Sequence, residues 1–225
     1  MFKDRKEAGL KLVQLLKDEQ IAFDIVMGIP RGGVLVGEVV AAAFGKTMDV
    51  VMVKKLESSN LLDFALGAVT PDGEILRHQH LDENLIETDP DTINRLAARV
   101  MFEINQRLKV FRSYRPAVNV KGNAVLLVDD GIASGFTVKA AASYLRRQGA
   151  IRVIVAVPVC AYNAYLLLGE VVDSIISLKI PRDLYAVSQF YQDFSAVEDN
   201  DIIDALLRLN PGPAPSPPRQ HLDAG

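Results

Sequence analysis

The sequence has very little cysteine and no tryptophan: one Cys and no Trp among 225 residues. A single cysteine cannot form a disulfide framework or a zinc site built on several thiolates. The longest apolar runs, such as 153–161, fall well short of the ~20 residues that a membrane-spanning helix needs. The charged segment 1–9 lacks the apolar stretch of a secretion signal. We therefore expect a cytoplasmic protein that does not contact a membrane.

An excess of charge of one sign is also lacking. The 25 Lys and Arg residues nearly balance the 28 Asp and Glu residues, which gives a formal net charge of −3. Nucleic-acid-binding domains are usually strongly basic, so we expect no nucleic-acid partner. With 49% apolar residues, the chain can bury a sizeable core. We predict one domain over 1–209 and a disordered, proline-rich tail over 210–225.

The hydrophobic pattern alternates between short apolar strands and amphipathic helices, which is typical of α/β proteins with a mostly parallel sheet flanked by helices. The predicted strands are 24–28, 49–53, 123–128, 152–159 and 174–178. The predicted helices are 4–19, 34–44, 137–148, 162–169 and 201–209. A hairpin of strands 64–70 and 74–80 around Pro71-Asp72-Gly73, and a long helix from about 88 to 114, predict an insertion over about 57–120.

One segment, 125–137, concentrates the side chains that suit a sugar phosphate. An apolar strand ends in Asp129 and Asp130, and a loop then leads into a helix. The loop contributes two glycines and two hydroxyl side chains, Gly131, Gly135, Ser134 and Thr137. Glycines let a backbone approach a ligand closely, and N–H groups at a helix start favour an anion. Because carboxylates suit vicinal hydroxyls or Mg²⁺, the segment predicts a site for ribose 5-phosphate.

Other sites that contain acids or bind phosphate fit this segment less well. Response-regulator receivers place paired acids at the first strand of the domain, whereas several elements precede this pair. The Gly-x-x-x-x-Gly-Lys pattern of P-loop NTPases is absent, and no Gly-x-Gly-x-x-Gly follows a predicted strand. A purely structural turn would not need two acids and two hydroxyls together. These comparisons leave the sugar-phosphate site as the main hypothesis.

Residues 125–137 resemble the phosphoribosyl pyrophosphate (PRPP) motif of type I phosphoribosyltransferases. The order of segments over 1–209 is similar to that of a group of bacterial and archaeal phosphoribosyltransferases of unassigned substrate. This order is Pro-Arg-Gly-Gly, Val-Lys-Lys, hairpin, long helix, PRPP motif and aromatic segment. The resemblance implies a type I phosphoribosyltransferase fold with a C-terminal hood over about 180–198, and it implies a homodimer. It further implies Mg²⁺-dependent transfer of ribose 5-phosphate from PRPP to a nitrogenous base, with release of pyrophosphate.

The resemblance also implies roles for single residues. Asp129 and Asp130 would hold the ribose hydroxyls and would meet Mg²⁺ indirectly, through PRPP and water. Arg31-Gly32-Gly33 would form the pyrophosphate loop, next to a cis peptide bond, and Lys54 and Lys55 would reach the same pyrophosphate. Asp129, Asp130, Arg31 and Lys55 are thus the expected catalytic residues. The 5′-phosphate would lie among seven residues of the loop: Gly131, Ile132, Ala133, Ser134, Gly135, Phe136 and Thr137.

The acceptor base is expected to bind under the hood. Tyr185, Phe190 and Tyr191 could place aromatic faces on a nucleobase, and a small local core is the alternative interpretation of these rings. The resemblance places Ala133 where 6-oxopurine phosphoribosyltransferases carry an acid that acts as general base. Alanine cannot perform that step, so we do not expect salvage of hypoxanthine or guanine by that mechanism.

Four further hypotheses remain open at this point. The same fold can serve as a non-catalytic sensor of PRPP or nucleotides, or as a ribose-phosphate hydrolase or phosphorylase. His78 and His80 would face the same side of a strand and could bind a metal, although no third ligand is evident. Six Arg and Lys side chains over 95–115 are explained by a solvated helix face, with a surface for a polyanion as the alternative.

Overall fold

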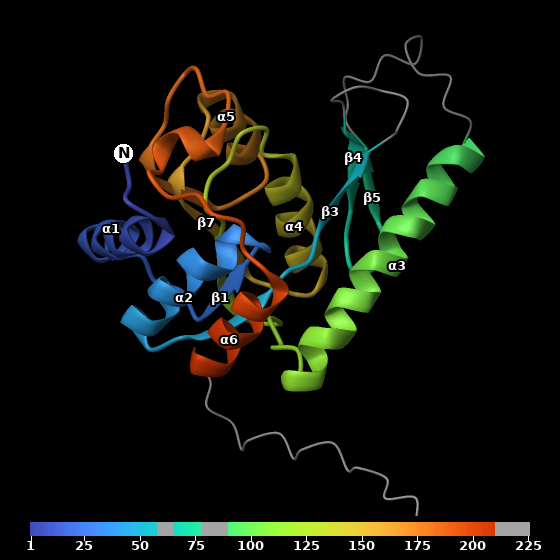
Figure 1. Ribbon diagram of the computed structural model, residues 1–225, viewed down its shortest axis with the longest axis horizontal. Coiled ribbons are helices and arrows are strands. Elements are labelled where there is room, and N and C mark those ends of the chain that lie inside the picture. Colours follow the sequence, from blue (N-terminus) through green and yellow to red (C-terminus); the bar gives the residue numbers. More distant parts are fainter. Residues whose placement is uncertain (58–64, 78–89, 210–225) are drawn as a thin grey trace, which may run out of the picture.

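The computed structural model describes residues 1–57, 65–77 and 90–209. Its centre is a five-stranded sheet in the order β2–β1–β6–β7–β8, and all neighbouring strands are parallel (Figure 1). The strands are β1 (Ile25–Gly28), β2 (Thr47–Val50), β6 (Ala124–Val128), β7 (Arg152–Val159) and β8 (Ser174–Lys179). This arrangement confirms the mostly parallel α/β sheet that the sequence predicts.

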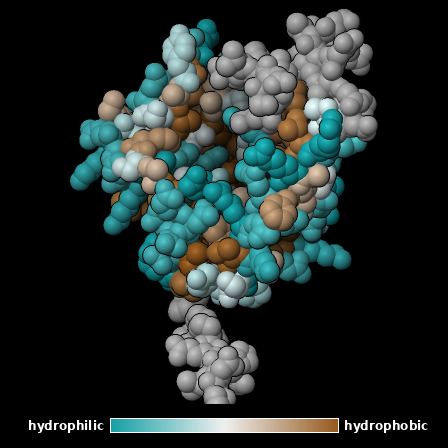
Figure 2. All heavy atoms as spheres, turned by 45° about the vertical axis from the view of Figure 1, so that its right-hand side comes forward, coloured by the Kyte–Doolittle hydropathy of each residue, from teal (hydrophilic) through white to brown (hydrophobic). Residues whose placement is uncertain are grey.

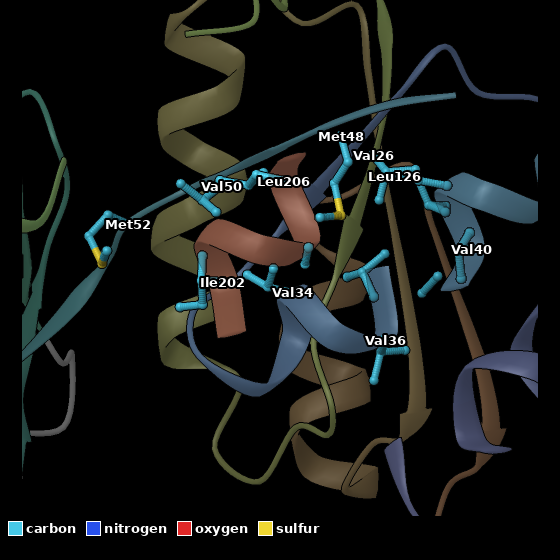
Figure 3. Close-up of a cluster of buried hydrophobic side chains, with 14 of the residues drawn as sticks. Val26, Val34, Val36, Val40, Met48, Val50, Met52, Leu126, Ile202 and Leu206 are labelled. Carbon is cyan, nitrogen blue, oxygen red and sulfur yellow. The ribbon is translucent and has the colours of Figure 1, made fainter. Parts of the chain in front are cut away.

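Helices cover both faces of this sheet, which explains why its strands are apolar throughout rather than alternating. The helices around the sheet are α1 (Arg5–Asp18), α2 (Gly32–Phe44), α4 (Phe136–Arg147), α5 (Tyr162–Gly169) and α6 (Asp199–Leu209). Val26 and Leu126 pack with side chains of α2 and α6 (Figure 3), and side chains of α1 belong to the same cluster. Their neighbours Val125 and Leu127 pack with α4 and α5 on the opposite face. Successive residues of one strand thus enter two separate hydrophobic cores.

A second, antiparallel sheet stands beside the core (Figure 1). It consists of β3 (Lys54–Glu57), β4 (Ala65–Val69) and β5 (Ile75–Arg77), and the helix α3 (Pro90–Tyr114) runs along it. The predicted turn is confirmed, because Gly73 adopts a φ of 86° between β4 and β5. His78 and His80, the first residues of the predicted long helix and the tail over 210–225 lie outside the described residues.

The end of the second parallel strand differs from the prediction. The sequence predicts a strand over 49–53, whereas β2 ends at Val50 and the chain then crosses to the small sheet. Lys54 and Lys55 therefore begin β3 and do not end a parallel strand. The run 50–53 is buried throughout, so its hydrophobicity could not reveal where one strand ends and the next begins.

A buried ion pair anchors α3 to the core. Asp49 of β2 is only 3% exposed, and its Oδ1 accepts a hydrogen bond from Arg112 Nη1 at 2.7 Å. Its Oδ2 accepts a hydrogen bond from the Val118 N–H at 2.9 Å. Arg147 of α4 pairs with Asp72 in the β4–β5 turn at 3.0 Å. The insertion is thus held to the core by two ion pairs, and the charges of both act on Tyr144 of α4.

Asp49→Ala is expected to lower the free energy of unfolding by about 2–4 kcal/mol, because it leaves Arg112 and the N–H groups of Val50 and Val118 without their acceptor. Urea unfolding followed by circular dichroism would measure this loss. Arg146→Ala is the matched control, since it breaks a partly exposed ion pair with Asp173 and should cost about 0–1 kcal/mol. Equal losses in the two variants would contradict the anchoring role of Asp49.

The segment after β8 folds back over the N-terminal residues. It forms a short 3₁₀ helix, η1 (Val187–Phe190), and an extended stretch that leads to α6. Phe2 pairs with this stretch, donating its N–H to the Phe190 carbonyl at 2.7 Å and accepting from the Gln192 N–H at 2.8 Å. We call residues 180–198 the hood segment.

Hydrophobic side chains on the visible face of the molecule form a few small areas within a mostly hydrophilic surface (Figure 2). Within the described part of the chain, no helix is both long enough and apolar enough to span a membrane.

Candidate functional site

The acidic pair lies at the carboxyl end of β6, the central strand of the parallel sheet. This is the edge where open α/β sheets bind their ligands. The loop after the pair is fixed to the end of β7, since the Ile132 N–H donates to the Val159 carbonyl at 2.9 Å. The Ile132 carbonyl in turn accepts a hydrogen bond from the Ala161 N–H at 2.8 Å. Gly135, with a φ of 78°, then turns the chain into α4, so the N-terminus of α4 faces the loop.

Two cavities meet at this edge of the sheet. The first, of about 160 Å³, is lined by residues 131–135, together with Val187 of the hood segment. The second, of about 360 Å³, is lined by four cations: Arg31, Lys54, Lys55 and Arg107. Lys55, Asp129 and Thr137 line both. The cavities therefore form one continuous site, with backbone N–H and hydroxyl groups at one end and positive charge at the other.

The Pro-Arg-Gly-Gly segment packs directly against the acidic pair. The Pro30–Arg31 peptide bond is cis, as the resemblance implies. A Cβ at Gly33 would lie 2.6 Å from the Val128 carbonyl oxygen and 2.7 Å from the Cα of Asp129. Since real Cβ atoms do not approach backbone so closely, only glycine lets this loop lie against the end of β6. The packing brings Arg31 into the same cavity as Asp129.

Within the described residues, three of the four cations have acidic partners. Arg31 Nη1 donates to the Val197 carbonyl at 3.0 Å and lies 3.5 Å from Glu198 Oε2. Lys54 pairs with Glu103 of α3. Arg107 Nε lies 3.4 Å from Asp199 Oδ2, at the start of α6. The partners come from α3, from α6 and from the residue just before α6, so both helices contribute to the cationic end of the site.

Burial and mutual repulsion control the charge of the acidic pair. Burial, with a further contribution from the Asp130 charge, raises the pKa of Asp129 well above its usual range. Burial also raises the pKa of Asp130, while the Arg5 guanidinium opposes this shift. Arg5 Nε lies 2.7 Å from Asp130 Oδ2. The Asp130 N–H donates to Asp129 Oδ1 at 2.8 Å, and the Tyr191 hydroxyl donates to the Asp130 carbonyl at 2.6 Å.

The acidic pair could bind a magnesium ion only together with a ligand that supplies further oxygen atoms. Among residues 1–57, 65–77 and 90–209, no three His, Cys, Asp or Glu side chains gather as a metal site. Mg²⁺ commonly keeps several waters and binds through one or two carboxylates together with substrate phosphates. Asp129 and Asp130 can supply that number of carboxylates.

The structure separates the three aromatic residues predicted to contact a base. Tyr191 is only 5% exposed, and its ring lies between Phe2, 5.4 Å away, and Phe194, 5.0 Å away. Phe190 packs on the same cluster. Tyr185 is 87% exposed. Tyr191 and Phe190 thus belong to a small local core, the alternative that the sequence left open, and of the three only Tyr185 presents an exposed ring.

Sequence reasoning missed two arginines of this site. Arg107 was one of six basic residues on the long helix, and nothing in their spacing indicates which of them faces the core. Arg5 lies 125 positions from Asp130 in the sequence. A basic residue in the first turn of an amphipathic helix gives no signal of such a distant partner.

Comparisons with known proteins identify the family and the fold. A family model described as the phosphoribosyl transferase domain matches residues 6–177. Two Mycobacterium tuberculosis proteins, from strains CDC 1551 and H37Rv and provisionally named phosphoribosyl transferases, are 32% identical over 216 residues. The match covers 93% of this chain and 47% of theirs, so the chain spans about half the length of these curated relatives.

A solved structure matches over nearly its whole length. The crystal structure of the Thermus thermophilus protein TT1426 superimposes with a TM-score of 0.78 at 37% identity. The match covers 93% of this chain and 99% of that one. Together with the family model, this similarity confirms the resemblance and the fold that the motif over 125–137 implies. The chain belongs to the phosphoribosyl transferase domain family.

Proposed function

We propose that this chain transfers ribose 5-phosphate from PRPP to a nitrogenous, nucleobase-like acceptor and releases pyrophosphate. The observation that carries the proposal is the continuous site at the end of β6. A phosphate would bind among the N–H and hydroxyl groups of 131–137, and a ribose diol would lie between the two cavities, beside Asp129, which lines both. A pyrophosphate fits the cavity lined by four cations. PRPP carries these three groups in this order.

The chemistry requires positioning and charge stabilisation. As the bond between C1 of the ribose and the pyrophosphate oxygen breaks, positive charge develops on the sugar ring and negative charge on the leaving group. Arg31, Lys54, Lys55 and Arg107 would stabilise the leaving pyrophosphate. Asp129 and Asp130 would accept hydrogen bonds from the ribose hydroxyls and hold the ring in place. Mg²⁺ bound together with PRPP would neutralise part of the pyrophosphate charge.

The side chains of the loop 131–137 restrict which acceptor bases could react. Ala133 is exposed in the cavity that would hold the 5′-phosphate, and it carries no group that could accept a proton. The proposal therefore favours an acceptor that needs no carboxylate from this position. Tyr185 is the aromatic side chain of the hood segment that is most exposed and able to contact such an acceptor.

Calorimetric titration of PRPP, with and without Mg²⁺, tests the proposal. We expect binding that depends on Mg²⁺ and that is at least about tenfold tighter than binding of ribose 5-phosphate, because only PRPP reaches the cationic end. A screen of bases for pyrophosphate release would then identify the acceptor. PRPP affinity no higher than that of ribose 5-phosphate would contradict the proposal. Tight binding without base-dependent release of pyrophosphate would instead indicate a sensor.

A further inference from the structure

A separate cavity, of about 360 Å³, lies between the parallel sheet and the insertion. It is lined by β1, β2, the segment that joins β2 to β3, the β4–β5 turn, α3, residues 117–120 and the end of α4. Its volume is within the range of cavities that bind small molecules. Neither the hood segment nor any residue assigned above to PRPP lines it. This cavity is therefore distinct from the site at the end of β6.

The polar side chains at this cavity carry no net charge. Of the described residues that line it, only Asp49 and Arg112 are charged, and these two form the ion pair that anchors α3. Burial, with a further contribution from Asp72, raises the pKa of Tyr144, so its hydroxyl stays protonated at neutral pH. A charged ligand would find no cation or anion here that lacks a partner of opposite sign. The cavity therefore favours a neutral ligand.

Several hydrogen-bonding groups at this cavity have no partner among the described residues. Arg112 uses one nitrogen, Nη1, on Asp49. The Tyr144 hydroxyl and the side-chain amide of Gln148 form no hydrogen bond within that part of the chain. Asn119 engages only its Oδ1, on a backbone N–H. A ligand thus meets a guanidinium, a hydroxyl and two carboxamides that can still form hydrogen bonds.

Two thioethers and a phenol ring accompany these polar groups. Met27 and Met52 line the cavity together with Tyr144. Thioether sulfur atoms and aromatic side chains both make favourable contacts with an aromatic ring. Arg, Asn and Gln side chains suit the donors and acceptors on the edge of a nucleobase. A neutral heteroaromatic ring with carbonyl or amino groups satisfies both conditions.

The cavity shares two of its walls with the cationic cavity of the proposed PRPP site. Met52 lines both cavities, and the chain runs on from it to Lys54 and Lys55. On α3, Arg107 lines the cationic cavity and its neighbour Leu108 lines this one. A ligand that packs against Met52 and Leu108 therefore restricts the two segments that carry three of the four cations.

We propose that this cavity is a second ligand site, which binds a neutral, nucleobase-like heteroaromatic molecule, and that its occupation strengthens pyrophosphate binding at the cationic cavity. Binding to the second site is independent of the proposed function. The coupling rests on the proposed function, because the pyrophosphate is that of PRPP. A filled cavity holds Met52 and Leu108 in place, so the cationic cavity loses less conformational freedom when an anion binds.

NMR titration with adenine and with uracil, both uncharged at neutral pH, tests the site. We expect saturable shifts of the amide signals of 117–120 and 144–148, with dissociation constants of about 0.1–1 mM for molecules of this size. Absence of shifts at these residues would overturn the proposal. Shifts confined to the hood segment would also overturn it, because the probes would then bind only at the proposed acceptor position.

Ala117→Trp is designed to fill the cavity from its rim, because Ala117 is exposed and lines it. We expect adenine affinity to fall at least about tenfold, since the indole would clash with the ligand. Ala98→Trp is the matched control, because Ala98 is an exposed residue of α3 that does not line the cavity. Its adenine affinity should be unchanged.

Tyr144→Phe removes a single hydroxyl from the cavity and should weaken adenine binding about two- to tenfold. This variant also serves if Ala117→Trp does not fold. Equal adenine affinity in Tyr144→Phe, Ala117→Trp and the unchanged protein would overturn the proposal even if adenine binds.

Calorimetric titration of pyrophosphate with Mg²⁺ measures the coupling. Saturating adenine is expected to tighten pyrophosphate binding about fivefold in the unchanged protein and to have no effect in Ala117→Trp. No effect in the unchanged protein, or the same effect in both proteins, would overturn the coupling. Adenine binding to a protein that does not bind pyrophosphate would support the second site and contradict the proposed function, and the coupling with it.

Discussion

Asp129→Asn combined with Asp130→Asn is expected to weaken PRPP binding at least about a hundredfold while the protein stays folded. Each carboxylate would lose a hydrogen bond to a ribose hydroxyl, and a bond to a charged group contributes about 1.5–3 kcal/mol. Since about 1.4 kcal/mol corresponds to a factor of ten, two such losses exceed a hundredfold. Calorimetry with PRPP and Mg²⁺ would measure the affinity, and circular dichroism would verify the fold. Unchanged affinity would remove the acidic pair from the sugar site.

The single variant Asp129→Asn provides a control, because we expect it to raise the stability of the protein while it weakens PRPP binding. The folded protein raises the pKa of Asp129, so the folded state binds more protons than the unfolded state once the pH exceeds the ordinary value. Asp129 therefore costs no stability below that value, and its cost grows as the pH rises toward the folded pKa. At neutral pH and above, we expect Asp129→Asn to melt at a higher temperature than the unchanged protein and to bind PRPP more weakly. A lower melting temperature would contradict this account of the buried pair.

Arg31→Ala is expected to weaken PRPP binding about 10- to 100-fold and to change binding of ribose 5-phosphate less than about threefold. The reason is that Arg31 lines the cationic cavity, and only PRPP carries the pyrophosphate that would fill it. Parallel titrations with the two ligands measure the difference within one variant. Lys55→Ala and Arg107→Ala should show the same selectivity, because both side chains line the same cavity.

Arg99→Ala is the matched control for the cationic end. Arg99 lies on α3 with Arg107, but its side chain is 80% exposed and it does not line the cavity. We expect it to bind both ligands as the unchanged protein does. Equal losses of PRPP and ribose 5-phosphate affinity in Arg31→Ala would mean that the Pro-Arg-Gly-Gly loop does not hold the pyrophosphate.

Much of the fold could be predicted because its signals are local. Apolar strands buried on both faces, the Pro71-Asp72-Gly73 turn and the loop between Asp130 and α4 each depend on residues within a few positions of one another. The boundary between β2 and β3 could not be predicted, because residues 50–53 are uniformly apolar and buried. Hydrophobicity reports burial there and does not report which sheet a residue joins.

The site was predictable only where its residues share one segment. The acidic pair and the phosphate loop lie within 125–137, so their spacing carries the chemistry. Arg5 and Arg107 reach the site from α1 and α3, and their role depends on how distant helices pack. The aromatic residues of the hood segment were ambiguous for a related reason. Tyr191 is buried by Phe2, a partner from the opposite end of the sequence, and no local pattern predicts that contact.

Three cations of the site pair with Glu103, Glu198 and Asp199. We expect these pairs to make the site prefer ligands of high negative charge. Acidic side chains pair with Arg31, Lys54 and Arg107. If the proposed pyrophosphate site is correct, we expect a ligand at this end to replace these acids, which a ligand with several negative charges close together would do best. Inorganic phosphate carries fewer charges than pyrophosphate at neutral pH, so it competes poorly against such internal partners. We therefore expect these ion pairs to disfavour small anions of low charge.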